Sequence, residues 1–165
     1  MKKFSFSEAI YYFEEMKKAG FKPEKNLYSI LLHGLAKSQN NLVEKYFKEM
    51  AEQGYTHDDS NLNSLIESYS RIPEYEKCKQ IYLQMIKEKR EIKIIVFKCM
   101  MKACNSPKEL KNLYMEMKCR KLYPDEQIFF SIHIKCIKKR DRETSLWLEK
   151  EMQKFGLTYP PGKIK

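Results

Sequence analysis

Apolar and polar residues alternate along the chain with the period of amphipathic helices. Four apolar residues fall at i, i+3, i+4 and i+7 and therefore share one helix face: Tyr28, Leu31, Leu32 and Leu35. The apolar pattern before them is interrupted by Gly20 and Pro23, residue types that end a helix and do not continue it. The pattern predicts a helix, a turn and a second helix.

A methionine marks the same place in each copy of this pattern. Met16 is followed, at intervals of 34, 35, 32 and 35 residues, by Met50, Met85, Met117 and Met152. Aromatic residues stand three positions before the first four: Phe13, Phe47, Tyr82 and Tyr114. Glycine or lysine stands four positions after each: Gly20, Gly54, Lys89, Lys121 and Gly156. A period in the thirties over paired helices is typical of an α-solenoid.

The predicted fold is all-α: a right-handed α-solenoid of antiparallel helix-turn-helix repeats with about nine helices. We expect a single domain over residues 1–157, with a C-terminal tail at 158–165. It would hold a leading half repeat at 4–24 and full repeats at about 26–58, 60–93, 95–125 and 127–157. The methionine and aromatic positions should be among the most buried. Ser106-Pro107-Lys108-Glu109 predicts a capping box.

The net charge of +10 is concentrated in the second half of the chain. Residues 1–76 hold 10 Lys and Arg against 12 Asp and Glu, whereas residues 77–165 hold 22 against 10. This asymmetry favours a polyanionic partner, nucleic acid rather than membrane, for the C-terminal half. The alternative is that these lysines lie on solvent-exposed helix faces and have no polyanionic partner.

The chain shows no pattern of an enzyme or of a metal site. It lacks a phosphate-binding glycine loop, a nucleophile motif, paired carboxylates on a recognisable scaffold and any Cys-x-x-Cys pair, so we expect no catalysis, cofactor, metal or small-molecule substrate. Cys78, Cys104 and Cys136 take core positions, while Cys99 and Cys119 should be more exposed. His133 stands in an apolar position and is expected to be a core histidine. No apolar run reaches the roughly 18 residues of a membrane span.

The segments around the methionines resemble the pentatricopeptide repeat. The similarity is carried by EEMKKAGFKPE, KEMAEQGYTHD, MEMKCRKLYPD and KEMQKFG, and by the helix openings NLYSILLHGLAKS and SNLNSLIESYSR. The tetratricopeptide repeat requires a Trp-x-x-Leu-Gly-x-x-Tyr opening that no repeat shows. The resemblance implies a single-stranded RNA-binding solenoid of mitochondria or chloroplasts, in which two side chains of each repeat read one base.

The resemblance also implies which residues read bases. The pairs are Ser29 with Asp58, Asn63 with Lys93, Lys98 with Asp125, and Phe130 with Pro160. Only the first resembles a working pair of the family, of the sort that prefers guanine. The other three depart from the pattern, which argues against base-by-base reading.

The same helix faces carry cations suited to phosphate contacts. Ser29, His33 and Lys37 share one stripe, and Phe130, Ile134 and Lys138 share another, in which Phe130 could stack on a base or pack between repeats. A second cationic group is the run of Lys135, Lys138, Lys139 and Arg140. The predicted RNA-binding residues are Ser29, Lys37, Asp58, Asn63, Arg71, Lys98, Lys102, Asp125, Phe130, Lys135, Lys138, Lys139 and Arg140.

The number of repeats limits what the protein could recognise. Four repeats would read about four bases, a sequence that recurs about every 256 nucleotides and cannot address one transcript. We therefore expect a subunit that holds RNA, such as ribosomal RNA, within a ribonucleoprotein assembly such as the mitochondrial ribosome. The alternatives are a free transcript-processing or stability factor, and a protein–protein scaffold without RNA. The mitochondrial matrix is implied by the resemblance alone, since residues 1–7 do not form a recognisable transit peptide.

The first predicted helix has no preceding partner helix. Its apolar residues should therefore meet a partner subunit or a preceding segment, and the predicted partner-binding residues are Phe4, Phe6, Ile10 and Tyr12.

Overall fold

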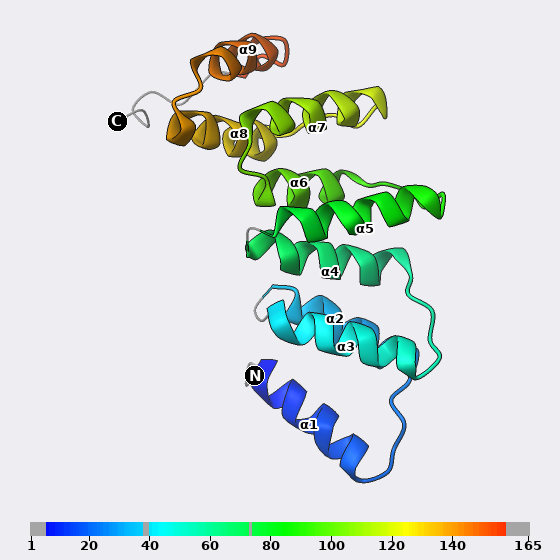
Figure 1. The fold of residues 1–165 in the computed structure, drawn as a ribbon. Helices are drawn as coiled ribbons and strands as arrows, with labels where there is room; N and C mark the ends of the chain where they lie inside the picture. The colour runs from blue at the N-terminus through cyan, green and yellow to red at the C-terminus, as the bar shows by residue number, and fades with distance from the viewer. Residues whose placement is uncertain (1–5, 38–39, 73, 158–165) are drawn as a thin grey trace. The chain divides into compact units, whose positions relative to one another are not determined.

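The computed structural model describes residues 6–37, 40–72 and 74–157, which form nine α-helices and no strand (Figure 1). The predicted all-α fold of paired helices is confirmed. The helices are α1 (Phe6–Lys18), α2 (Lys25–Leu35), α3 (Asn40–Glu52), α4 (Asp59–Arg71), α5 (Tyr75–Lys87), α6 (Ile94–Ala103), α7 (Pro107–Cys119), α8 (Glu126–Lys139) and α9 (Arg142–Gln153).

Contacts divide the chain into two compact units, unit 1 (Met1–Ile92) and unit 2 (Lys93–Lys165). In unit 1, α2 pairs with α3 and α4 pairs with α5, while α4 also packs against both helices of the preceding pair. Helix α1 packs against α2. In unit 2, α6 pairs with α7 and α8 pairs with α9, and α8 contacts both α6 and α7. We call α2, α4, α6 and α8 the first helices of their repeats, and α1, α3, α5, α7 and α9 the second helices.

The second helices α1, α3, α5, α7 and α9 all end with the same backbone motif. The carbonyl of its methionine accepts a hydrogen bond of 2.9 to 3.1 Å from the N–H five residues later, as Met16 does from Phe21. The residue four after each methionine has a positive φ, between +54° and +84°. Glycine fills three of these places, but Lys89 and Lys121 fill the other two at φ +54° and +58°. The repeated glycine-or-lysine position is therefore the left-handed residue that closes each helix.

The repeated methionines form the core, with one exception. Met50, Met85 and Met117 are fully buried, and Met152 is 7% exposed. Met16 is only half-buried, because it lines a groove between α1 and α2 that no described residue fills. Among the aromatic positions Phe47 is likewise half-buried, and its ring stacks on that of His57 with centroids 3.5 Å apart.

Two local predictions require correction. Ser106 Oγ accepts the Glu109 N–H at 3.4 Å, but the Glu109 carboxylate lies 3.7 Å from Cys104 Sγ, so only half of the predicted capping box is found. Cys99 was expected to be exposed, yet it is 4% exposed. Residues on several faces of α6 are buried, so its period did not single out one inward stripe. Cys119 is exposed, and Cys78, Cys104 and Cys136 are buried, as predicted.

Tyrosine–glutamate hydrogen bonds join second helices. Tyr46 Oη donates to Glu14 at 2.7 Å in unit 1, and Tyr114 Oη donates to Glu151 at 3.0 Å in unit 2. Burial alone would raise the pKa of the Glu151 carboxyl, but hydrogen bonds from Lys154, Lys118 and Tyr114 lower it to about 2. These carboxylates therefore stay ionised inside the helix contacts.

Candidate nucleic-acid interface

The first predicted base-reading pair is held in place by a buried asparagine. Asn61 Nδ2 donates to Ser29 Oγ at 3.0 Å, and the Asn61 N–H donates to Asp58 Oδ1 at 2.9 Å. The Asp58 N–H donates back to Asn61 Oδ1 at 3.1 Å, which completes a capping box at the start of α4. Sequence reasoning missed Asn61, although the Asp-x-x-Asn spacing could have indicated it. Ser29 and Asp58 are thus already engaged within the protein.

The predicted pair Lys98 and Asp125 forms an ion pair in unit 2. Asp125 also caps α8, where its Oδ1 accepts the Ile128 N–H at 3.1 Å. Burial opposes ionisation of Asp125, but the Lys98 bond and the Ile128 N–H hold its pKa below the usual value. A cleft of about 120 Å³ opens beside Lys98, between α6 and α8, and its other lining residues include Lys102 and Gln127.

Two predicted phosphate-contacting cations cap the preceding first helix. Arg71 Nε donates to the Ala36 carbonyl, just after the end of α2, at 2.9 Å. Lys135 Nζ donates to the carbonyls of Met101 and Lys102 at 2.6 Å each and also to that of Cys104, around the end of α6. Burial lowers the pKa of Lys135, and the charges of Lys138 and Lys102 lower it further. Their contact with RNA stays a prediction.

Four of the predicted cations of unit 2 remain exposed and form no ion pair among the described residues: Lys102, Lys138, Lys139 and Arg140. Lys102 and Lys138 lie in the last turns of α6 and α8, and both are close enough to Lys135 to affect its pKa. The Phe130 ring is 38% exposed. The first helices of unit 2, together with the residue that follows α8, therefore present a cationic surface. We call it the α6/α8 surface and define it by Lys102, Lys138, Lys139 and Arg140.

Charge also differs between the two units, although less strongly than between residues 1–76 and 77–165. Residues 93–165 hold 17 Lys and Arg against 8 Asp and Glu, whereas residues 1–92 hold 15 against 14. Lys37, which with Arg71 makes up the predicted cations of unit 1, is exposed. Asn63, on α4, is half-buried, and its buried Oδ1 has no hydrogen-bond partner among the residues described.

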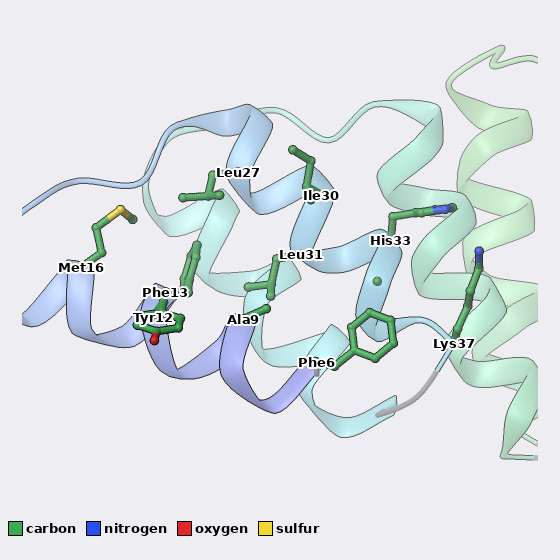
Figure 2. A pocket seen from close by; sticks show the side chains of 11 residues that line it. Phe6, Ala9, Tyr12, Phe13, Met16, Leu27, Ile30, Leu31, His33 and Lys37 are labelled. Atoms are coloured by element: carbon green, nitrogen blue, oxygen red, sulfur yellow. The ribbon is translucent and has the colours of Figure 1, made fainter. Parts of the chain in front are cut away.

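The predicted partner-binding residues are only partly brought together. Phe6 and Tyr12, 47% and 61% exposed, line the α1/α2 groove, which has a volume of about 660 Å³ (Figure 2). Ile10 is half-buried and is not one of the groove's lining residues. Phe4 lies outside the described residues.

Across residues 6–37, 40–72 and 74–157, no three His, Cys, Asp or Glu side chains gather as a metal ion would require. Within these same ranges no helix has the length and apolar character to cross a membrane.

The fold is similar to solved structures of pentatricopeptide repeat proteins. The PPR domain of Arabidopsis thaliana protein-only RNase P 1, solved in complex with tRNA, has a TM-score of 0.77 and 10% identity over 94% of this chain and 84% of that one. The pentatricopeptide repeat protein PPR10 from maize has a TM-score of 0.69 and 22% identity, and nuclear proteinaceous RNase P 2 from A. thaliana has 0.74 and 8%. The chain covers only 23% and 35% of the latter two, and PPR10 is also solved in complex with an 18-nt psaJ RNA element.

No family sequence model matches the chain, and neither does any curated protein sequence. The structural similarity nevertheless agrees with the repeat spacing and with the five identical helix closures. The described part of the chain has the pentatricopeptide repeat fold that the sequence resemblance implies.

Proposed function

We propose that this chain binds single-stranded RNA through phosphate contacts on the α6/α8 surface, as a non-catalytic subunit of a ribonucleoprotein assembly. The observation that carries the proposal is the position of Lys102 and Lys138 on consecutive first helices of the basic unit 2. Both side chains are exposed, and both ammonium groups are free of ion pairs within the described residues. Cations placed in this way attract a phosphate backbone without reading its sequence.

The proposed contact is to phosphates rather than bases because two of the predicted base-reading pairs are already occupied. Ser29 and Asp58 are both bonded to Asn61, and Lys98 is paired with Asp125. A base could contact these groups only by competing with bonds that the protein makes internally. Affinity would then depend on salt more strongly than on sequence.

The structural neighbours support RNA as the polyanion. PPR10 was solved with an RNA element, and the PPR domain of protein-only RNase P 1 was solved with tRNA. We do not extend to this chain the nuclease activity that the names of the RNase P proteins imply, since the chain covers 35% of nuclear proteinaceous RNase P 2 and the other match is a repeat domain.

The finer part of the proposal concerns the host assembly. A protein that binds RNA with little sequence preference needs other subunits to fix its location. Ribosomal RNA in the mitochondrial ribosome, within the mitochondrial matrix, fits this requirement. A free factor for transcript processing or stability is the alternative. One structural neighbour is nuclear, so the compartment must be established by imaging the tagged protein.

The experiment is a fluorescence anisotropy titration with a mixed-sequence RNA strand of about 20 nucleotides at about 50 mM KCl. We expect saturable binding that weakens steeply with salt and is nearly unchanged for a second strand of different sequence. Polyglutamate of similar charge is the control for general anion binding. No binding to RNA, or equal binding to polyglutamate, would contradict the proposal. Crosslinking in cells followed by sequencing of the bound RNA distinguishes ribosomal RNA from transcripts.

A further inference from the structure

The α1/α2 groove has the form of a repeat that lacks its first helix. Its walls are apolar side chains of both helices: Ala9, Tyr12, Phe13 and Met16 of α1, and Leu27, Ile30 and Leu31 of α2 (Figure 2). The Phe6 ring closes one end against α2, so closely that a Cβ at Gly34 would lie 2.8 Å from Phe6 Cε1. Figure 2 also shows Lys37 at this end.

The next repeat shows what fills the same space. The counterparts of Leu27 and Ile30, 34 residues later on α4, are Asn61 and Ser64. Leu27 is 36% exposed and Ile30 is 71% exposed, whereas Asn61 is fully buried and Ser64 is 3% exposed. Helix α2 contributes to this burial, because Asn61 donates to Ser29 of α2 at 3.0 Å. One helix laid along α2, as α2 lies along α4, would therefore cover the open side of the groove.

The cation at the groove's end indicates the direction of that helix. Lys37 is the counterpart of Arg71, whose Nε donates to the Ala36 carbonyl at the C-terminal end of α2. In unit 2, Lys135 binds the carbonyls at the end of α6 in a similar way. The Lys37 ammonium has no hydrogen-bond partner among the residues that the structure describes. It is placed to bind the unpaired carbonyls, and the negative dipole end, of a helix that is not part of unit 1.

We propose that the α1/α2 groove docks one amphipathic helix of a partner protein, parallel to α2 and with its C-terminal carbonyls at Lys37. The partner's facing residues are bulky and apolar, because Leu27 and Ile30 stand where the internal contact has Asn61 and Ser64. The proposal deepens the subunit role proposed above, since it gives the attachment point to the assembly. It is independent of the RNA surface, which lies on unit 2.

The probe is a helical peptide derived from α2 itself. It copies residues 25–37, carries Ser29→Leu to meet Leu27, and has an amidated C-terminus. A hydrocarbon staple between positions 30 and 34 keeps it helical, because so short a peptide is marginally helical in water. The control peptide has the same composition and staple in scrambled order. Binding to the full chain is measured by fluorescence anisotropy.

We expect saturable, micromolar binding of the probe and none of the scrambled peptide. Ile30→Glu should weaken binding about tenfold or more, because it places an unpaired carboxylate against the apolar face. Lys37→Glu should weaken it about threefold, because it reverses the charge at the helix end. Leu83→Glu, at an exposed position of α5, is the matched control and should leave binding unchanged. RNA affinity should be the same for Ile30→Glu as for the parent.

Direction is tested with a nitroxide label on either end of the peptide. A C-terminal label should broaden the NMR signals of residues 33–37, and an N-terminal label those near Leu27. The opposite pattern, or equal binding of the scrambled peptide, overturns the proposal. Sedimentation that shows a dimer of the chain, abolished by Ile30→Glu, also overturns it, because a second copy would then be the occupant. If the chain binds the peptide but does not bind RNA, the proposed RNA function is wrong and the docking proposal still stands.

Discussion

The guanidinium Nε of Arg71 lies 2.9 Å from the carbonyl oxygen of Ala36, 35 residues earlier in the chain. Its side chain extends from the last turn of one first helix to the end of the preceding one. Arg71 therefore joins successive repeats, although its position in the sequence indicated an RNA contact. Lys37 holds the same position one repeat earlier, and there no helix end is present among the described residues.

Replacing Arg71 should cost stability, while replacing Lys37 should not. Arg71→Ala removes a charge-assisted bond to a helix end and should lower the free energy of unfolding by about 1 to 2 kcal/mol. Lys37→Ala is the matched control and should change it by less than about 0.5 kcal/mol, because the side chain is exposed and unpaired in the described structure. Urea denaturation followed by circular dichroism measures both values. Equal effects of the two substitutions would contradict the assigned role of Arg71.

Removing the left-handed strain at Lys121 should stabilise the protein. Lys121 closes α7 with φ +58°, a conformation that costs a residue with a Cβ about 1 kcal/mol, and Lys121→Gly should recover most of this. Lys121→Ala keeps the strain and removes only the exposed part of the side chain beyond Cβ, so it should be nearly neutral. Gly54→Ala should destabilise the protein, because alanine is strained at φ +83°. The added Cβ would meet no atom within 4 Å, so no new packing contact offsets this strain. Thermal unfolding distinguishes the three variants.

The buried carboxylate of Glu151 should make stability depend on acid pH. Its folded pKa is about 2, below the usual value of 4.5, so its contribution is present above about pH 4.5 and is lost as the pH falls toward 2. Glu151→Gln should therefore destabilise by about 2 kcal/mol at pH 7, and the difference from the parent should shrink between pH 5 and pH 3. Glu143→Gln, at an exposed carboxyl of the same helix, is the control. A pH-independent difference would show that packing, rather than charge, gives Glu151 its role.

The sequence was sufficient to predict the repeat but not the partners of its polar residues. Met85 and the left-handed Lys89 could be located because helix closure is local and its spacing is constant. The starts of the first helices also followed from local signals, such as Asp125 before α8. The fold was therefore predictable almost helix by helix.

The uses of Arg71, Lys98 and Lys135 were not predictable in this way. Each side chain meets a group 27 to 35 residues away, at a helix end whose distance depends on how consecutive repeats pack. In the sequence, a cation on this helix face is compatible with two roles, a contact to an RNA phosphate and a cap on a neighbouring helix. Only the structure separates Lys102 and Lys138, which are exposed and unpaired within its described ranges, from the cations that are engaged.

The most direct measurement compares RNA binding by two double variants of unit 2 across a series of salt concentrations. Lys102→Glu with Lys138→Glu alters the α6/α8 surface, and Lys108→Glu with Lys150→Glu makes the same charge change at exposed positions of second helices. We predict that the first variant loses affinity for every single strand to a similar degree. Its salt slope should fall by about 0.7 for each phosphate contact removed, while the second variant keeps most of the parent's affinity and slope. If the first variant binds RNA like the parent, or both variants lose affinity equally, the α6/α8 surface does not bind RNA.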